Sequence, residues 1–524
     1  MRTISLYMVI ILIITGLCFG KAIVVDVAKP CGLTWDGEHF WTTDRQEGLV
    51  CQLDETGKVI TSFSVGPMPM GVAWDNGRLW VVDREDGTLS LVEPGGKVIK
   101  ALSLPVDRPA GLSLGQDGLW LADERARKLV KVSTTDGSIL DEMPAPYGLN
   151  GLCVATDGDF YLSSRLYDRI YRGSVAHKLC YYYFPSPGTY AWGLAGKGEE
   201  IWHIDQAERT LQPLELPKKW VQGEKKERVV HLRNGLYNYG PGEVTDVKLY
   251  VALPENKYNQ EIKAIRHSRA ADEQLVDDNG QAFACFYFDR VKPGQRIRVI
   301  TDVAFSHWSV QAAITPEDVG GEIPKHIRDL YVRDGEKYDL DFAGYDAMLA
   351  RADQEENLYL KAFRIYRYVA DQVEYELYGG WEPASVVLSR GSGSCSEYSF
   401  STLALLRKAG IPARYVGAVS LRGDDICYDN VSHRWIEVYL PGFGWFPVDA
   451  NAGDSDDVAR QAFSFGGTAQ GYLITTKHYG PSRYLEWSYN SHMTFARQGK
   501  AKVYEESLAE WDLPEGVEPE RRDP

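Results

Sequence analysis

The chain has 524 residues, a formal net charge of −16 and a pI near 5.2. A chain of this length is too long for a single hydrophobic core, so several domains are expected. The acidic balance, which no cluster of Lys and Arg offsets, argues against non-specific binding to nucleic acid or to an anionic membrane surface. With 44% hydrophobic residues, 31 Tyr and 14 Trp, the composition is typical of a globular protein rich in β-structure.

Residues 1–20 have the pattern of a secretory signal peptide. An apolar run from Ile4 to Gly20 follows Arg2, and its small last residues permit cleavage before Lys21. The alternative is an uncleaved membrane anchor, because the run is just long enough to span a bilayer. No later run is long and apolar enough to do so. We therefore expect an exported protein, periplasmic, extracellular or at the cell surface, with no transmembrane span beyond the signal.

Seven cysteines lie beyond the predicted signal, and export makes disulfides possible. Because the number is odd, at least one thiol remains outside any intramolecular disulfide. Their scattered spacing, without a C-x-x-C pair, argues against a zinc site, and we expect neither a metal nor a cofactor. The seven are Cys31, Cys51, Cys153, Cys180, Cys285, Cys395 and Cys427.

Residues 21–217 contain five copies of one repeat, which open at Gly32, Gly71, Gly111, Gly151 and Gly193. The copies resemble the propeller repeats of the NHL and SMP-type families. The glycines that open the copies are 39, 40, 40 and 42 residues apart. Such a period, filled by four short alternating strands, is typical of a β-propeller blade. We predict about five blades, and the strand-like segment 23–27 is a candidate to close the ring.

Four of the five copies also carry an aspartate at the same place, namely Asp44, Asp83, Asp123 and Asp205. Some propellers are metal-dependent lactonases, so these carboxylates are candidate metal ligands. A metal site would place unlike ligands once on the axis, whereas a repeated aspartate more often bonds a turn or a neighbouring strand. By fold analogy we interpret the propeller as a spacer or as a platform that binds a protein or glycan partner.

Residues 218–320 have a different pattern, with strand-like alternation at 228–232, 246–254, 282–288 and 296–303 and turns between the strands. About 100 residues of this kind suit an immunoglobulin-like β-sandwich. Nothing in this segment resembles a catalytic motif. Cys285, inside a predicted strand, is interpreted as a buried apolar residue.

Residues 321–497 mix helices with strands. The segment 355–377 carries apolar residues at helical spacing and is predicted to be one amphipathic helix. Strands are predicted at 413–419 and 432–440. Residues 498–524 are predicted to be a C-terminal tail, acidic and disordered toward its end.

The strongest chemical signal is a cysteine at the start of a predicted helix. Ser394 and Glu397 are spaced as a capping box, in which the serine hydroxyl caps the helix and the carboxylate reaches back to the serine N–H. The helical run after them ends at Gly410. Cys395 then occupies the first helical position, where unpaired N–H groups and the positive end of the helix dipole favour a thiolate.

A base and an orienting acid are available in a predicted hairpin further along the chain. If the hairpin turns near residues 441–442, His433 and Asp449 lie within about one pair of each other across it. The carboxylate can then hold the imidazole so that its other nitrogen faces the Cys395 thiol. This arrangement is the Cys-His-Asp form of nucleophilic catalysis.

Four linked blocks in this region resemble the core of the transglutaminase-like superfamily. The resemblance covers about residues 325–490 and implies a papain-like α+β fold with Cys395, His433 and Asp449 as the catalytic triad. The preceding sandwich fits the β-domain often found before such cores. The blocks are Gly393-Ser394-Cys395-Ser396-Glu397-Tyr398, Leu406–Val416, His433–Val438 and Gly444–Asp449.

The resemblance implies a thioester acyl-enzyme and leaves its acceptor open. Ser396 stands where animal transglutaminases have a Trp, and the acidic run 454–457 is interpreted as a solvated loop and not as a calcium site. Both features favour hydrolysis of peptide or other amide bonds over the alternative, protein cross-linking. The Cys395 N–H is the predicted oxyanion donor. A further alternative is a non-enzymatic surface adhesin in which Cys395 forms a disulfide, for example with Cys427.

Overall fold

The computed structural model describes residues 22–352, 355–377, 381–422 and 427–512; the predicted signal peptide lies outside the described residues. The chain divides into two compact units. The first comprises Met1–Lys178 and Pro185–Leu216, and the second comprises Leu179–Phe184 and Pro217–Pro524. No helix within the described ranges is long and apolar enough to cross a membrane.

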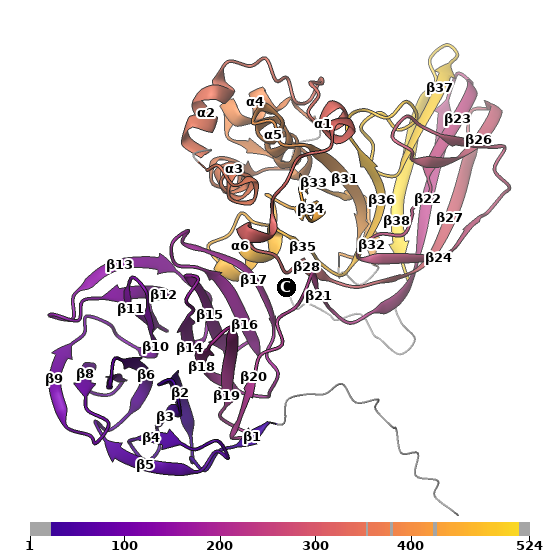
Figure 1. The fold of residues 1–524 in the computed structure, drawn as a ribbon. Helices are drawn as coiled ribbons and strands as arrows, with labels where there is room; N and C mark the ends of the chain where they lie inside the picture. The colour runs from indigo at the N-terminus through magenta and orange to yellow at the C-terminus, as the bar shows by residue number, and fades with distance from the viewer. Residues whose placement is uncertain (1–21, 353–354, 378–380, 423–426, 513–524) are drawn as a thin grey trace, which may run out of the picture. The chain divides into compact units, whose positions relative to one another are not determined.

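The predicted propeller consists of five four-stranded sheets arranged around a centre (Figure 1). Its residues belong to the first unit apart from Leu179–Phe184 in β17. The sheets are β2–β5 (Pro30–Trp35, Phe40–Asp44, Leu49–Leu53, Val59–Ser64), β6–β9 (Pro69–Asp75, Arg78–Asp83, Thr88–Val92, Val98–Ser103), β10–β13 (Pro109–Gly115, Gly118–Asp123, Lys128–Val132, Ile139–Pro144), β14–β17 (Leu149–Val154, Asp159–Ser164, Arg169–Ser174, Leu179–Pro185) and β18–β20 with β1 (Ala191–Lys197, Glu200–Asp205, Thr210–Pro213, Ile23–Val24). The prediction of five blades is therefore confirmed.

The ring is closed by the N-terminal strand, as predicted. Strand β1 pairs with β20, so that residues from the start of the chain form the outer strand of the fifth blade. The innermost strands also form a closed circle, because β18 of the last blade contacts β2 of the first. The repeat glycines permit this approach: a Cβ on Gly32 would lie 2.7 Å from the carbonyl oxygen of Met70 in the next blade.

The repeated aspartates bond turns, in line with the structural role that the sequence favoured. In the first copy, Asp44 accepts the N–H groups of Gln46 (2.9 Å) and Glu47 (3.2 Å) with one oxygen and that of Ala28 (2.9 Å) with the other. Asp83 and Asp205 make the same three kinds of contact. These carboxylates fix the turn that follows the second strand of each blade.

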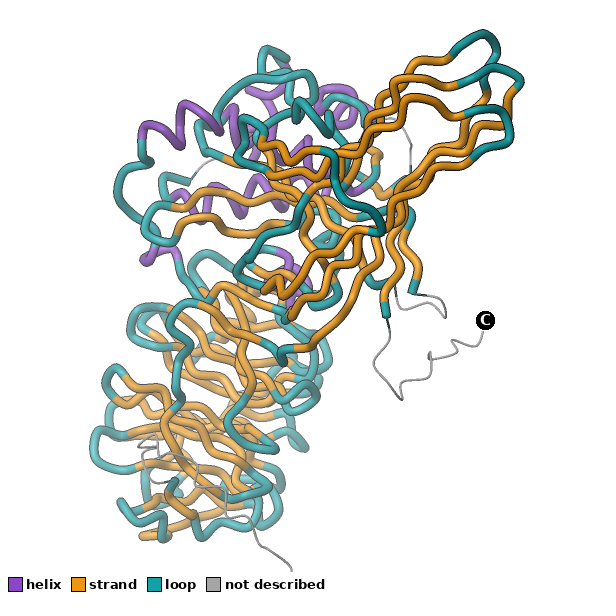
Figure 2. The backbone as a smooth tube through the Cα atoms, turned by 90° about the vertical axis from the view of Figure 1, so that its right-hand side faces the viewer, coloured by secondary structure: helices purple, strands orange, loops and turns teal. Residues whose placement is uncertain are grey.

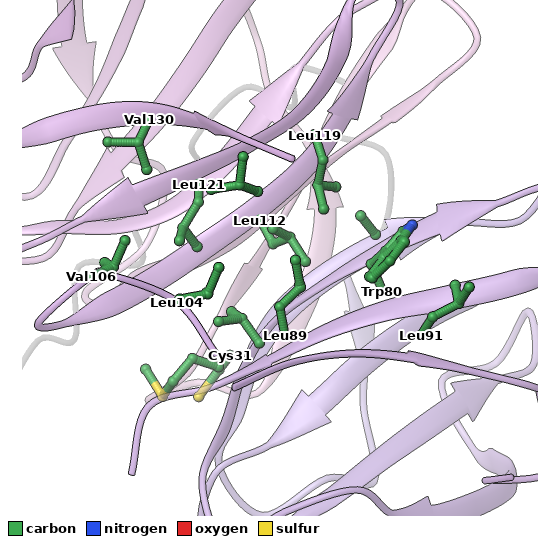
Figure 3. Close-up of a cluster of buried hydrophobic side chains, with 14 of the residues drawn as sticks. Cys31, Trp80, Leu89, Leu91, Leu104, Val106, Leu112, Leu119, Leu121 and Val130 are labelled. Atoms are coloured by element: carbon green, nitrogen blue, oxygen red, sulfur yellow. The ribbon is translucent and has the colours of Figure 1, made fainter. Parts of the chain in front are cut away.

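The interior of the propeller is apolar. One cluster of buried side chains joins the first three blades and includes Cys31, Trp80, Leu89 and Leu112, with part of it shown in Figure 3. Each of these four side chains is at most 2% exposed. The burial of such aliphatic and aromatic surface between the sheets supplies the main stabilisation of the ring.

The second unit contains a β-sandwich whose strands come from two distant parts of the chain. One sheet has the order β24-β27-β22-β38-β32 and the other β25-β26-β23-β37, and all their pairings are antiparallel. The strands are β22 (Lys226–Gly240), β23 (Val244–Ala252), β24 (Gln260–His267), β25 (Glu273–Val276), β26 (Ala282–Val291), β27 (Arg296–His307), β32 (Tyr428–Asp429), β37 (Ser491–Arg497) and β38 (Lys502–Trp511). Cys285 is fully buried within β26, as predicted.

Two predicted boundaries are wrong at the C-terminal end. Residues 498–524 were predicted to be a tail, yet Lys502–Trp511 form β38, which pairs with β22 along ten residues. Likewise Ser491–Arg497, predicted to end the catalytic domain, form β37 of the sandwich. The pairing partners lie more than 200 residues apart in the chain, so local patterns gave no sign of them. The remainder of the predicted tail, residues 513–524, lies outside the described residues.

The α+β region of the second unit carries the helices (Figure 2), beside a sheet of order β34-β33-β31-β36. The predicted long helix is shorter than expected, because Asn357 caps α3 at its start and a short strand, β29, follows its end. The elements are α1 (Lys325–Tyr331), α2 (Gly344–Ala352), α3 (Leu358–Gln372), α4 (Ala384–Arg390), α5 (Cys395–Lys408), α6 (Val458–Ser464), β31 (Ala413–Ser420), β33 (His433–Leu440), β34 (Gly444–Val448) and β36 (Tyr472–His478).

Short elements complete this unit. A three-stranded sheet has the order β21-β28-β35, and a two-stranded parallel pair, β29-β30, precedes α5. These are β21 (Trp220–Gln222), β28 (Val310–Ala312), β35 (Gly467–Thr468), β29 (Glu374–Tyr375) and β30 (Ser392–Gly393), together with the 3-10 helix η1 (Pro316–Asp318). The chain therefore runs from the propeller through most of the sandwich to the α+β region and then returns to the sandwich with β37 and β38.

Candidate active site

Helix α5 begins at Cys395, as the capping residues predicted. The backbone N–H of Ser394 donates to Oε2 of Glu397 at 2.7 Å, and the Glu397 side chain is completely buried. Cys395 is 5% exposed, and its Sγ lies at the end of the helix where the N–H groups have no partner within the helix. The local sequence therefore holds the sulfur at a fixed, electropositive position.

The predicted hairpin brings His433 and Asp449 together. Strands β33 and β34 pair from Leu440 opposite Gly444 to Ile436 opposite Val448, so the turn lies where the sequence placed it. Asp449 follows the last pair, and its Oδ2 lies 2.7 Å from Nε2 of His433. Its other oxygen accepts the N–H of Ala452 at 3.0 Å. These contacts fix the imidazole and leave Nδ1 for the thiol.

The Cys395 thiol and the His433 imidazole shift each other's pKa in the directions that favour the thiolate and the imidazolium. Burial raises the pKa of Cys395, but a hydrogen bond with His433, the imidazolium charge and the backbone N–H of Arg434 outweigh it and leave the pKa below its ordinary value. Burial lowers the pKa of His433, whereas the charge of Asp449 and hydrogen bonds with Asp449 and Cys395 raise it well above its ordinary value. Both shifts favour the thiolate–imidazolium form of the pair over the neutral form.

Arg434, directly after His433, also contributes to the site. Its side chain is completely buried, with the guanidinium 4.4 Å from the ring centre of Tyr489 and 4.8 Å from that of Tyr415. One of its terminal nitrogens donates to the carbonyl oxygen of Trp487. The fixed positive charge helps to lower the pKa of Cys395.

Tyr489 is a site residue that the sequence did not reveal. Its hydroxyl lies 4.0 Å from Cys395 Sγ and hydrogen-bonds to the hydroxyl of Ser396. Burial raises its pKa, so the phenol keeps its proton and can donate. Tyr489 comes 94 residues after the cysteine and just before β37. Only the tertiary fold brings it to the sulfur, and no local motif marks it.

Cys395 lies where two cavities meet. The first, of about 450 Å³, is lined on one wall by Leu377 and Trp381 and on another by Tyr489 and Met493. The second, of about 420 Å³, is more polar, and its lining includes Arg422, Asn451, Asp454, Arg460 and His433. Both contain Cys395, Val431 and Ser432. A substrate chain can therefore occupy both sides of the sulfur at once.

Cys427, considered above as a disulfide partner of Cys395, lies in a different part of the second unit. Cys427 packs in an apolar cluster with Val419, Leu473 and Trp511, and the part of the chain that the structure describes contains no disulfide.

The acidic run after the hairpin also has structural contacts: Asp454 accepts from the hydroxyl of Tyr398 at 2.9 Å, and Asp457 caps α6. Within the described residues, no three His, Cys, Asp or Glu side chains are grouped so as to hold a metal ion.

Residues 347–450, which contain Cys395, His433 and Asp449, match the model of the transglutaminase-like superfamily. This segment is a transglutaminase-like domain. The resemblance inferred from the sequence blocks is thereby confirmed. Members of the superfamily are typically cysteine peptidases or acyltransferases. No curated protein matches the chain.

Several solved structures are similar to parts of the chain. A Cytophaga hutchinsonii protein named as a "putative cysteine protease" has 14% identity and a TM-score of 0.40, covering 58% of this chain and 96% of its own. The glutaminyl cyclase of Myxococcus xanthus has 13% identity and a TM-score of 0.34, covering 38% and 94%. Virginiamycin B lyase from Staphylococcus aureus has 19% identity and a TM-score of 0.27, covering 36% and 66%. At these identities the likenesses say nothing about activity.

Proposed function

We propose that the protein is an exported cysteine hydrolase that cleaves peptide or other amide bonds through a thioester acyl-enzyme. The observation that carries the proposal is the connection of Cys395, at the start of a capped helix, to His433 and through it to Asp449. Export rests on the apolar run of residues 4–20. The transglutaminase-like domain supplies the reaction class, acyl transfer to and from a cysteine.

The first half of the reaction forms the thioester. The Cys395 thiolate attacks the carbonyl carbon, and the C–N bond of the amide breaks as the tetrahedral intermediate collapses. The imidazolium of His433 gives its Nδ1 proton to the departing amine. Asp449, bonded to Nε2, holds the ring so that this proton faces the sulfur.

The second half releases the acid. Neutral His433 takes a proton from water, the hydroxide oxygen adds to the thioester carbon, and the C–S bond breaks. The products are a carboxylic acid and the regenerated thiolate–imidazolium pair. Two donors lie close to the sulfur for the developing oxyanion: the backbone N–H of Cys395, at the first position of α5, and the hydroxyl of Tyr489.

A covalent probe and a product assay test the proposal together. The protein should be labelled by a peptide-like acylating probe at one site, and Cys395→Ala should abolish labelling and hydrolysis of peptide substrates. A Cys51→Ala variant, in the propeller, is the matched control and should retain both. Unchanged labelling of Cys395→Ala would overturn the assignment. Incorporation of a fluorescent amine into the acyl group in place of water would identify an acyltransferase instead.

A further inference from the structure

The first cavity beside Cys395 is built largely by the sandwich. Strands β22, β23, β37 and β38 each contribute to its lining, and the α+β region supplies Cys395 and the opposite wall. Its deeper part is apolar, because Leu249 of β23 and Met493 of β37 line it and are 2% and 8% exposed. Leu377 and Val431, which also line it, are 63% and 37% exposed. A side chain that enters this cavity therefore meets apolar surface from both regions.

The charged side chains that line this cavity are acidic. Glu505 and Glu506 both belong to β38, and no Lys or Arg of the described ranges lines the cavity. Glu506 already has a cation, because Arg298 donates to its two oxygens at 2.7 and 2.6 Å. Glu505 is exposed, and its carboxylate has neither an ion pair nor a hydrogen bond with another residue that the structure describes. Glu505 therefore offers a carboxylate to a bound group.

The charge around the cavity stays negative when the groups behind its walls are counted. Nε2 of His492, which lines the cavity, lies 3.7 Å from a carboxylate oxygen of Glu486. A buried guanidinium, that of Arg434, lies 4.4 Å from the ring centre of Tyr489. With the thiolate–imidazolium pair counted as neutral, the carboxylates outnumber the guanidinium groups: Glu486, Glu505, Glu506 and Asp449 oppose Arg298 and Arg434. The field in the cavity therefore attracts a cationic group.

The place of His433 decides which half of a substrate enters this cavity. In the proposed reaction the imidazolium gives its Nδ1 proton to the departing amine, so the amine needs to lie within hydrogen-bond reach of the ring. His433 lines the second cavity and is not among the described residues that line the first, whereas Tyr489, the proposed oxyanion donor, lines the first. The amine half of the substrate therefore lies in the second cavity, and the acyl half lies in the first.

We propose that the first cavity selects an acyl group whose side chain is long and ends in a cation, as in a Lys or Arg residue. The methylene groups of this side chain pack against Leu249, Met493 and Trp381, and its cationic end pairs with Glu505. This selection rests on the proposed hydrolase, because the role of His433 assigns the acyl half to this cavity. Glu505, on the sandwich, is then a specificity-determining residue of the site.

Binding to the Cys395→Ala protein tests the selection without any reaction. In calorimetric titration, acetyl-Ala-Lys-Gly-amide should bind about fivefold more tightly than the peptide with norleucine in place of Lys, and the peptide with Glu there should bind most weakly. Glu505→Gln, added to Cys395→Ala, should bring the Lys and norleucine peptides to within about twofold. Glu510→Gln is the matched control: it removes a carboxylate from the same strand that pairs with Arg233, and the preference should remain.

Hydrolysis by the unchanged protein tests the direction. Acetyl-Ala-Lys-Gly-amide should be cleaved after Lys, with a kcat/KM at least about fivefold higher than that of acetyl-Ala-Gly-Lys-amide, in which the cation lies in the amine half. Mass spectrometry of the products identifies the bond. Equal binding of the three peptides, a Lys preference that survives Glu505→Gln, or faster cleavage before Lys than after it would overturn the proposal.

Failure of the hydrolase would give a different result. If no peptide is hydrolysed, the proposed function and the assignment of the acyl half are both overturned. The titrations of Cys395→Ala would still decide whether the cavity selects a cation through Glu505, because binding requires no nucleophile.

Discussion

Two buried cysteines, one in each unit, lie beside arginines and differ in their chemistry. Cys31 is completely buried in the propeller, and burial raises the pKa of its thiol to about 12 although Arg45 and Arg84 lower it. Cys395 is 5% exposed, and its pKa is held below its ordinary value. Burial and a nearby arginine are common to both, so neither feature by itself makes a nucleophile.

The difference lies in the hydrogen bonds of the sulfur. The Cys31 thiol donates to the carbonyl oxygen of Lys29 and accepts from Nε2 of Gln206, both at 3.3 Å. The backbone N–H of Arg45 also lowers its pKa, but less than burial raises it. A backbone N–H also lowers the pKa of Cys395, but there the main contribution against burial comes from His433, which has no counterpart at Cys31. An imidazole held by a carboxylate therefore distinguishes Cys395, the proposed nucleophile, from Cys31.

Removal of each sulfur should give the largest contrast. We expect Cys395→Ala to lower kcat/KM for a peptide substrate by about 10⁴-fold or more, because the nucleophile is lost. Cys31→Ala should leave kcat/KM within about twofold and reduce only thermal stability, since it deletes a buried sulfur. Steady-state kinetics and thermal unfolding of both variants check this. Comparable losses of activity in the two would contradict it.

The same contrast is expected in alkylation of the unchanged protein. At pH 7 a thiol of pKa about 12 is ionised to about one part in 10⁵. Iodoacetamide should therefore modify Cys395 at least about 10³-fold faster than Cys31, as measured by mass spectrometry of peptides. Because its pKa is lowered, Cys395 should remain reactive at a lower pH than an exposed cysteine. Both should react alike in denaturant.

Asp449→Asn tests the orienting carboxylate. We expect kcat to fall by about 10²- to 10³-fold, because the imidazole loses its orientation and the imidazolium its counter-charge. Asp449 raises the pKa of His433, so its removal should lower that pKa. The alkaline limb of the pH–rate profile, where the imidazolium loses its proton, should then move to lower pH. A limb that stays in place would show that the carboxylate has only a structural role.

Tyr489→Phe should have the smallest effect. The variant keeps the ring beside Arg434 and removes the hydroxyl that lies 4.0 Å from Sγ. Loss of one oxyanion donor should lower kcat by about 10- to 100-fold with little change in KM. The hydroxyl of Ser396 loses the same partner. Ser396→Ala is therefore the control, and an equal loss in that variant would assign the effect to packing.

Local signals in the sequence predicted the nucleophile and its partners. Ser394 and Glu397 marked the start of a helix at Cys395, and the hairpin turn set the register between His433 and Asp449. The repeat glycines predicted five blades because each blade must approach the next closely. These features depend on residues near one another in the chain.

The features that the sequence missed depend on contacts between distant residues. Tyr489 reaches Cys395, and β38 reaches β22, only after the chain has folded. No helix cap, turn motif or hydrophobic periodicity predicts such a contact, because the local sequence around each partner is typical of an ordinary strand or loop.

The return of the chain into the sandwich has a practical consequence for expression. Strand β38 lies between β22 and β32 in its sheet, and β37 is the edge strand beside β23. A polypeptide that stops before residue 491 lacks both strands and leaves β22 and β23 with unpaired backbone edges, which favour aggregation. Any shortened version of the second unit therefore needs to extend to at least residue 511.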